Sequence, residues 1–270
     1  MADRSFFPSF QDNPVAAYGA TAAIAVVLAV LPFVVGTQGN AWVRIIDFAL
    51  LYVMLALGLN IVVGYAGRLD LGYGAFYAVG AYMFALLASP HLIETFGWIK
   101  AMFPNGLHAP IWLVIPLGAA IAATFGVLLG VPVLKLRGDY LAIVTLGFGE
   151  IIRVFLNNLD HPVNITNGPK GIGQIDSIKF FGFDLGKKLN ILGFDVAPVT
   201  LYYYLFLVLV VVSVVICHRL ELSRIGRAWM AIREDETAAK AMGINTRNLK
   251  LLAFGMGATF GGVSGVMFAS

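Results

Sequence analysis

Seven long apolar segments constrain the fold of this chain more than any other feature. They cover residues 16–36, 44–64, 71–89, 110–134, 139–157, 199–218 and 251–270. A helix needs about 20 mostly apolar residues to cross the hydrocarbon core of a bilayer. The chain is 59% hydrophobic and only 12% charged, so it has too few polar residues to cover a water-soluble globule. We therefore predict an all-α fold, a polytopic transmembrane helix bundle that forms one domain over residues 1–270.

Two long hydrophilic intervals, 158–198 and 219–250, set the expected orientation. Loops rich in lysine and arginine stay in the cytoplasm, so 219–250 is predicted to be cytoplasmic and 158–198 extracytoplasmic. Turn residues flank short β-prone runs such as Ile175–Phe181 in the outer interval, which predicts a small hairpin or an ordered connector. The basic residues of the inner interval are Arg219, Arg224, Arg227, Arg233, Lys240, Arg247 and Lys250.

The sequence offers no catalytic or metal-binding constellation. Cys217 is the only cysteine, which excludes an intrachain disulfide, and the four histidines are scattered along the chain. No segment matches the phosphate-binding pattern GxxxxGK[ST]. We therefore expect no enzyme activity, no metal site and no cofactor in this chain. If ATP drives the protein, another chain must bind the nucleotide.

Glycines recur every four positions in the last apolar segment, at Gly257, Gly261 and Gly265. This spacing lets helix backbones approach closely where lipid removes the hydrophobic drive for helix association. The pattern predicts helix packing and gives no information about cargo.

A glycine-rich break interrupts the apolar sequence between residues 58 and 74. Non-helical backbone at membrane depth is tolerated where protein or a water-filled cavity satisfies its polar groups, and transporters use such breaks to expose polar atoms to cargo. The break is therefore a candidate for an interrupted helix on a translocation path, and a simple cytoplasmic turn is the alternative. The candidate residues are Asn60, Gly64, Gly67, Asp70 and Gly72.

Glu150 and Arg153 lie three residues apart on one face of an otherwise apolar helix. Charges inside a membrane cost free energy, so they are usually paired and often functional. We expect the two side chains to pair with each other. They are either a structural ion pair or further candidates for the translocation path.

Residues 228–243 predict one short amphipathic helix in the inner interval. Trp229, Ile232, Ala239 and Met242 recur at helical spacing and would share its apolar face. We also expect an ion pair between Glu236 and Lys240 and a helix stop at Gly243. Such a helix could lie on the lipid surface or dock into a groove of a cytoplasmic partner. The small alanines favour docking.

Several longer strings resemble the branched-chain amino acid permeases of ABC transporters, of the LivM type, and occur in the order which that family has. The resemblance covers the chain from about residue 45 onward. The strings are GLNIVVGYAGRLDLGYGAFYAVGAY (58–82), LRGDYLAIVTLGFGEIIRVFLNN (136–158), TNGPKGI (166–172) and SRIGRAWMAIREDETAAKAMGIN (223–245).

The resemblance implies a permease subunit in the bacterial inner membrane. Its implied partners are a homologous second permease, two cytoplasmic ATP-binding subunits that hold ATP and magnesium, and a periplasmic substrate-binding protein. It also implies that residues 231–243 form the helix that couples to the ATPase. If this helix is seated in a groove on the ATPase, we expect Ala238 and Ala239 to face a tight contact. The coupling residues are Arg233, Glu236, Ala238, Ala239 and Gly243.

The implied cargo is leucine, isoleucine and valine. Import of urea or another small amide or acid by the same machinery is the alternative, since close relatives of the family carry such cargo. A secondary transporter driven by an ion gradient is a further alternative. Members of the family continue with more membrane helices after a position like Ser270, so we expect this sequence to be C-terminally incomplete.

Overall fold

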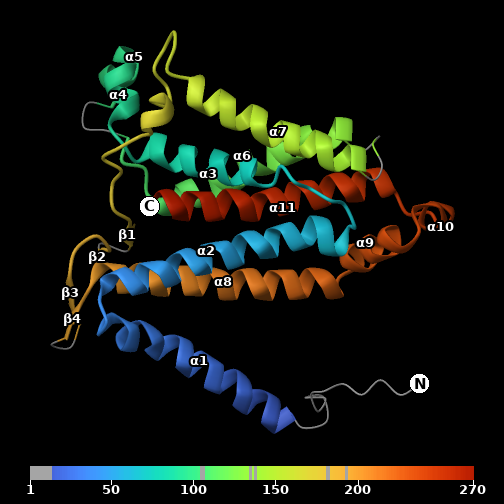
Figure 1. The fold of residues 1–270 in the computed structure, drawn as a ribbon, viewed down its shortest axis with the longest axis horizontal. Helices are drawn as coiled ribbons and strands as arrows, with labels where there is room; N and C mark the ends of the chain where they lie inside the picture. The colour runs from blue at the N-terminus through green and yellow to red at the C-terminus, as the bar shows by residue number, and fades with distance from the viewer. Residues whose placement is uncertain (1–13, 104–106, 134–135, 137–138, 181–182, 192–193) are drawn as a thin grey trace.

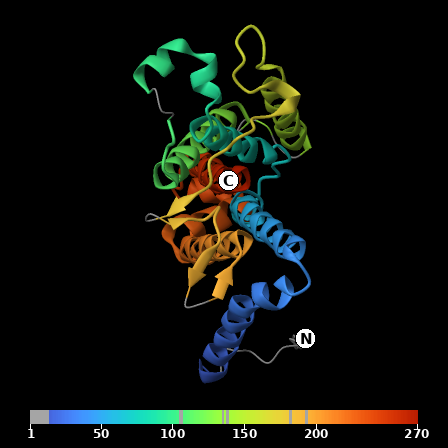
Figure 2. The same ribbon diagram turned by 90° about the vertical axis from the view of Figure 1, so that its left-hand side faces the viewer.

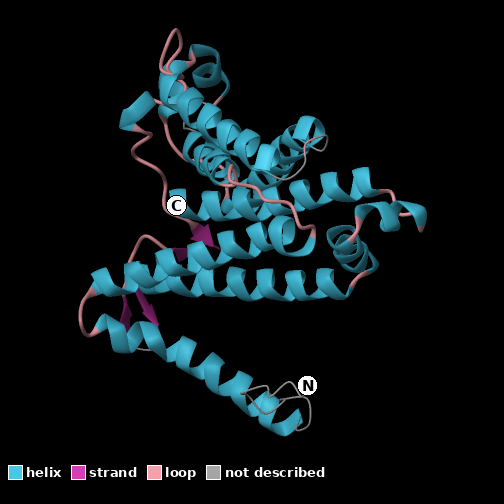
Figure 3. Cartoon of the chain, turned by 45° about the vertical axis from the view of Figure 1, so that its right-hand side comes forward, coloured by secondary structure: helices cyan, strands magenta, loops and turns pink. Residues whose placement is uncertain are grey.

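The structure is a computed structural model that describes residues 14–103, 107–133, 136, 139–180, 183–191 and 194–270. It is a helical bundle, and its strands are short (Figure 3). The long helices are α1 (Pro14–Gly36), α2 (Asn40–Asn60), α3 (Gly74–Leu87), α6 (Ile111–Val133), α7 (Asp139–Asn158), α8 (Pro198–Leu222) and α11 (Thr246–Ala269). The short helices are η2 (Ile61–Tyr65), α4 (His91–Thr95), α5 (Gly97–Met102), η3 (Gly168–Lys170), α9 (Arg224–Glu234) and α10 (Glu236–Ala241).

Among the described residues, five helices are long and apolar enough to cross a membrane. They are Asn40–Tyr65, Ile111–Val133, Tyr140–Asn158, Pro198–Leu222 and Thr246–Ala269. The chain is therefore a multi-pass membrane protein. The other two predicted spans contain shorter apolar helices, Ala23–Gly36 and Gly74–Leu87. The span predicted at 71–89 is too long, because the glycine-rich residues before Gly74 are not helical.

Helix α11 forms the centre of the bundle. It runs between α3, α6 and α7 on one side and α2 and α8 on the other (Figure 1). In its most apolar window 67% of the residues are buried, whereas no other candidate span exceeds 33%. The outer helices therefore leave much of their surface uncovered by the rest of the chain.

Glycines allow the close packing around α11. A Cβ atom at Gly257 would lie 2.5 Å from Val62 Cγ2, and one at Gly261 would lie 3.0 Å from Phe76 Cβ. At Gly265 the Cβ would lie 2.0 Å from the backbone oxygen of Tyr77. The three glycines thus share the side of α11 that faces α2, η2 and α3, where backbones meet without side chains between them.

Helix α1 diverges from the other helices (Figure 1). Two tyrosines of α8 form hydrogen bonds to it. The Tyr203 hydroxyl donates a hydrogen bond of 2.8 Å to the Leu28 carbonyl, and Tyr204 donates one of 2.5 Å to Ala29. Pro32 lies inside α1 and has no N–H to donate to the carbonyl four residues earlier, which is that of Leu28. Tyr203 therefore satisfies the backbone oxygen that Pro32 leaves open.

The loops sort to the two ends of the bundle as the charge pattern predicts. The end with α9 and α10 also carries residues 66–73, and the opposite end carries α4, α5 and the strands (Figures 1 and 2). Two small antiparallel hairpins form in the predicted outer interval, with Phe180 opposite Phe183 and Ile191 opposite Phe194. The strands are β1 (Lys179–Phe180), β2 (Phe183–Asp184), β3 (Leu189–Ile191) and β4 (Phe194–Val196).

Accessibility of single cysteines tests the orientation. In a background with Cys217 replaced by serine, Lys187→Cys should react with a membrane-impermeant thiol reagent added to intact cells. Met242→Cys should react only after the membrane is opened. Both native side chains are highly exposed, at 82% for Lys187 and 83% for Met242, so a slow reaction cannot be attributed to burial. The reverse labelling pattern would contradict the orientation.

Candidate functional site

The glycine-rich break begins where α2 changes to a π-helical turn. Residues Ile61–Tyr65 form η2, after which residues 66–73 are not helical. The Asn60 side chain lies against Gly64, where an added Cβ would be 2.0 Å from Asn60 Oδ1. Gly67 has φ +64°, a conformation that favours glycine, and packs against the Arg233 side chain. The break therefore lies at the α9–α10 end of the bundle.

The second half of the break lies against α7. The Leu71 backbone N–H donates to Thr145 Oγ1 at 3.0 Å, and a Cβ at Gly72 would lie 2.0 Å from the Thr145 carbonyl oxygen. Asp70 is 3% exposed, and its Oδ1 accepts a hydrogen bond of 2.9 Å from the Gly72 backbone N–H. Its Oδ2 has no hydrogen-bond partner among the described residues. Burial raises the pKa of Asp70 to about 6, although the bond from Gly72 opposes the shift.

Asp70→Asn should remove one component of the pH dependence of stability. The folded-state pKa of Asp70 lies above its usual value of 3.8. Its protonated form therefore favours the folded state below about pH 4, and this stabilisation is lost as the pH rises to about 6. The loss is on the order of 3 kcal/mol, so the variant should be the more stable protein at pH 7.5. Thermal unfolding in detergent from pH 4.5 to 7.5 measures the difference, with Glu94→Gln as an exposed control. A difference between variant and wild type that does not change with pH would contradict this role.

Glu150 and Arg153 pair with each other on α7, as expected. Arg153 Nε donates to the two carboxylate oxygens of Glu150 at 3.0 and 2.9 Å. Both side chains are exposed, at 56% for Glu150 and 67% for Arg153. They lie with Gly72 along a cavity of about 360 Å³ between α3 and α7. Three of the candidate path residues therefore lie around one cavity, whereas Asn60, Gly64, Gly67 and Asp70 do not line it.

The inner interval contains two helices where the sequence predicts one. The Asp235 side chain accepts hydrogen bonds from the backbone N–H groups of Thr237 and Ala238, so it ends α9 and caps α10. Met242 is 83% exposed, so its predicted place on the apolar face is wrong. Gly243 has φ +82° and ends the second helix, as expected.

The two alanines of the segment point in different directions. Ala239 is buried, together with Trp229 and Ile232, by other parts of the same chain. Ala238 is exposed. The prediction that both alanines contact a partner is therefore wrong for Ala239. Trp229 also donates a hydrogen bond of 2.7 Å from Nε1 to the Leu249 carbonyl, which holds α9 against α11.

Glu236 is the centre of an ionic cluster, the Glu236 cluster, formed with Arg68, Lys240 and Lys250. Its carboxylate lies 2.8 Å from Arg68, 3.0 Å from Lys240 and 2.5 Å from Lys250. The Lys250 side chain is only 3% exposed. The cluster therefore joins α10 to the glycine-rich break through Arg68 and to α11 through Lys250.

The electrostatics of the cluster favour ionised Glu236. Burial alone would raise its pKa, but hydrogen bonds from Lys250 and Lys240 and the charges of Lys250 and Arg68 lower it to about 2. Nearby, Arg233 Nη1 donates a hydrogen bond of 2.6 Å to the Gly64 carbonyl. Arg233 and Glu236 thus each connect the inner helices to the break.

The sequence predicted only the local part of this site. The Glu236–Lys240 pair follows from the helical spacing of the two residues. Arg68 lies 168 residues before Glu236, and its partnership has no signal in local periodicity. Lys250 is among the basic residues of the inner interval, and the sequence assigns it no partner.

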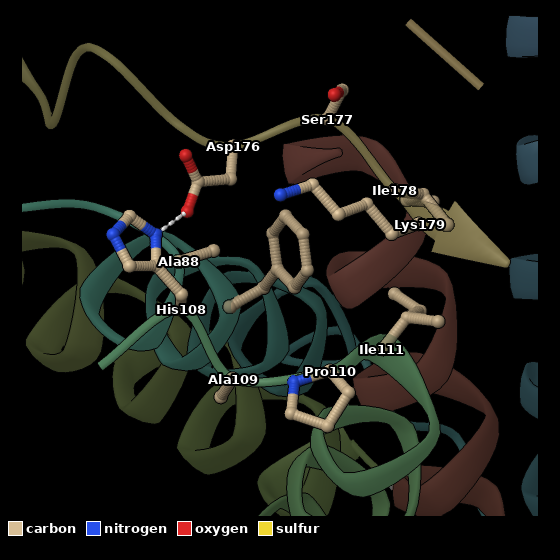
Figure 4. A pocket seen from close by; sticks show the side chains of 10 residues that line it. Ala88, His108, Ala109, Pro110, Ile111, Asp176, Ser177, Ile178 and Lys179 are labelled. Carbon is tan, nitrogen blue, oxygen red and sulfur yellow. Dashed lines mark hydrogen bonds and ion pairs between the residues drawn. The ribbon is translucent and has the colours of Figure 1, made fainter. Parts of the chain in front are cut away.

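A smaller cavity of about 100 Å³ lies at the opposite end of the bundle (Figure 4). The His108 ring faces Asp176 and hydrogen-bonds to its carboxylate. This contact joins the segment before α6 to the segment before β1. Lys179 and Ile178 form part of the lining.

Comparison with known proteins shows the family to which the chain belongs. The family described as "Branched-chain amino acid transport system / permease component" matches residues 41–270. The high-affinity branched-chain amino acid transport system permease protein LivM of Escherichia coli K12 is 42% identical over 260 residues, which are 92% of this chain and 56% of that protein. The high-affinity branched-chain amino acid permease protein LivH of Salmonella typhimurium is 24% identical over 220 residues. These residues are 80% of this chain and 65% of the LivH protein.

A probable LivM protein of Methanocaldococcus jannaschii is also 24% identical, over 81% of this chain and 64% of its own length. No solved structure matches the chain. The chain spans a little over half the length of the LivM protein of Escherichia coli. With the match over residues 41–270, it belongs to the family of permease components of branched-chain amino acid transport systems.

Proposed function

We propose that the chain is the translocating permease subunit of an ATP-driven importer for leucine, isoleucine and valine in the bacterial inner membrane. The chain is 42% identical to a LivM permease, and its five long apolar helices suit such a subunit. The observation that carries the proposal is the Glu236 cluster, which fastens the inner helices α9 and α10 to the membrane-spanning helices.

The inner helices combine a fixed inner face with a free outer face. Trp229, Ile232 and Ala239 hold the segment in place, whereas Ala238 and Gly243 are exposed. A cytoplasmic ATPase that binds the outer face would transmit its movement to α11 through Lys250. It would transmit the same movement to the glycine-rich break through Arg68. Movement at the ATPase would thus reach the spanning helices without a flexible link.

The cavity between α3 and α7 is the proposed section of the translocation path in this chain. Gly72 forms its inner end, and the Glu150–Arg153 pair supplies both signs of charge to a zwitterionic cargo. The remaining candidates, Asn60, Gly64, Gly67 and Asp70, would act by shaping the break next to this cavity.

The proposed assembly contains four further components. A homologous second permease completes the path, since LivM and LivH proteins are both related to this chain. Two cytoplasmic ATP-binding subunits hold ATP and magnesium, and a periplasmic binding protein delivers the cargo. The residues of this chain perform no chemistry on the cargo.

Purification and reconstitution test the proposal. The tagged full-length permease should co-purify with two ATPase subunits and one related permease. In proteoliposomes, leucine-loaded binding protein should stimulate ATP hydrolysis, and uptake should be inhibited by isoleucine and valine and not by urea. Uptake that needs an ion gradient and persists without the ATPase would contradict the proposal. Inhibition of uptake by urea, and not by isoleucine or valine, would contradict the proposed cargo.

A further inference from the structure

A second large cavity lies between α2, α8 and α11 at the end of the bundle that carries the hairpins. Its volume is about 380 Å³, within the range of small-molecule sites. Its lining includes two charged side chains, Arg44 and Asp47, on successive turns of α2. Neither residue belongs to the Glu236 cluster or to the cavity between α3 and α7.

Arg44 and Asp47 have the same spacing as Glu150 and Arg153 but a different arrangement. Both pairs lie three residues apart on a spanning helix, and Arg153 closes on Glu150 with two hydrogen bonds from Nε. Within the described part of the chain, Arg44 and Asp47 form no such ion pair, although both line the same cavity. Opposite charges held apart in one cavity can each bind a group of a ligand.

One oxygen of the buried Asp47 carboxylate is left without a partner in the described part of the chain. Asp47 is 6% exposed, and its Oδ1 has no hydrogen-bond partner among the described residues. Buried polar atoms are nearly always paired, because burial without a hydrogen bond costs free energy. A carboxylate held in this way at a cavity wall is suited to accept hydrogen bonds from a cation.

Apart from Ser270, which also lines it, the rest of the cavity is largely apolar. Leu51, Phe206 and Met267 are buried residues of one hydrophobic cluster and form part of its wall. Tyr202 adds a ring whose hydroxyl is already engaged by the Ile178 backbone N–H at 3.3 Å. The cavity therefore offers one cation, one anion and an aliphatic and aromatic surface.

We propose that this cavity is a subsite for a zwitterionic α-amino acid with an apolar side chain. Asp47 binds the ammonium group, Arg44 binds the carboxylate, and the apolar wall at Leu51, Phe206 and Met267 takes the side chain. The two charges of such a ligand are attached to the same carbon atom, so they fit two charged residues one helical turn apart. The proposal rests on the proposed function and adds to it a site where cargo first meets the permease.

A phospholipid with an ethanolamine headgroup carries the same two charges, so the test must separate the two sources. The whole importer is placed in nanodiscs made only of phosphatidylglycerol, which has no ammonium group. Val199→Cys, at the cavity wall, is introduced with Cys217→Ser. Modification of the introduced thiol by an impermeant reagent is followed by mass spectrometry of that peptide, with and without each ligand.

Leucine at ten times its Kd should slow the modification of the introduced thiol roughly tenfold, as occupancy requires. At the same concentration, 4-methylpentanoate, which lacks the ammonium, and 3-methylbutylamine, which lacks the carboxylate, should give little protection. Asp47→Asn keeps the shape of the side chain and should weaken protection by leucine roughly 30-fold, and Arg44→Gln should do the same. Glu94→Gln removes an exposed carboxylate at the same end of the bundle and should have no effect.

Three results would overturn the subsite: equal protection by leucine and both analogues, no protection by leucine, or protection only after phosphatidylethanolamine is added. If the Asp47 and Arg44 variants fail to assemble, the subsite is still tested by comparing leucine with its two analogues. This comparison uses the importer that carries only Val199→Cys and Cys217→Ser. Leucine uptake by the same complex separates the two proposals. Leucine uptake without protection of the introduced thiol would contradict the subsite alone. Absence of ATP-dependent leucine uptake would contradict the proposed function.

Discussion

Glu236→Gln is expected to abolish most leucine uptake by the reconstituted importer while leaving the permease in the membrane. Glutamine keeps the shape of the side chain but leaves Lys250, which is 3% exposed, without its counter-charge. Breaking a buried ion pair in this way costs about 3 kcal/mol. That cost corresponds to a factor of roughly 100 in any equilibrium that requires the cluster. The measurement compares ATP hydrolysis stimulated by loaded binding protein with uptake in the same vesicles.

Two variants make this result specific to the cluster. Glu234→Gln removes an exposed carboxylate two residues away and should behave as wild type. Glu236→Gln with Lys250→Met removes the most buried cation together with its counter-charge and should restore assembly in part, because Arg68, which is 15% exposed, is then the most buried cation left without its carboxylate partner. Normal coupling in Glu236→Gln would show that α10 reaches the spanning helices by another route.

The same cluster gives a defined acid sensitivity. The pKa of Glu236 is lowered from 4.5 to about 2 in the folded protein. The stabilisation from its ionised form is therefore complete above about pH 4.5 and is lost as the pH falls toward 2. Glu236→Gln should remove this component of acid unfolding.

Gly265→Ala should destabilise the bundle strongly. The new Cβ would lie 2.0 Å from the Tyr77 carbonyl oxygen and 2.8 Å from the Ala81 nitrogen. These are backbone atoms of α3, so neither can move aside as a flexible side chain does, and separation of α3 from α11 should cost about 3 kcal/mol. Thermal unfolding in detergent and the amount of folded protein in membranes both report the effect.

Gly147→Ala is the matched control on α7. An added Cβ at Gly147 meets nothing within 4 Å, and alanine favours a helix interior over glycine by about 1 kcal/mol. Gly147→Ala should therefore be neutral or stabilising, and Gly265→Ala should not. Equal effects of the two changes would mean that helix propensity, and not close packing, governs both positions.

The spanning helices could be predicted because lipid imposes a simple length rule on apolar sequence. The segment predicted at 139–157 corresponds to Asp139–Asn158, and the one at 199–218 corresponds to Pro198–Leu222. The rule failed at 71–89 because glycine is counted as compatible with an apolar run, although Gly72 is needed where the break touches α7. Composition detects the break without defining where the helix resumes.

The inner segment shows why periodicity was not sufficient for the site. Trp229, Ile232 and Ala239 keep helical spacing across Asp235, so the pattern continues through a residue that ends one helix and caps the next. The apolar pattern also cannot distinguish a helix face buried by the same chain from one buried by a partner. It could not tell that Ala239 packs inside its own chain, and Ala238, which is exposed, is the better position for a test of docking.

The bond between Tyr203 and Leu28 has a consequence for the order in which the protein is made. The donor and acceptor lie 175 residues apart, so α1 leaves the ribosome long before α8 exists. Until then the carbonyl that Pro32 leaves open has no permanent donor, and lipid supplies none. While α1 is being made, the Leu28 carbonyl therefore lacks the hydrogen bond that Tyr203 supplies in the folded protein. The attachment of α1 to the bundle can therefore be completed only after Tyr203 of α8 has been synthesised.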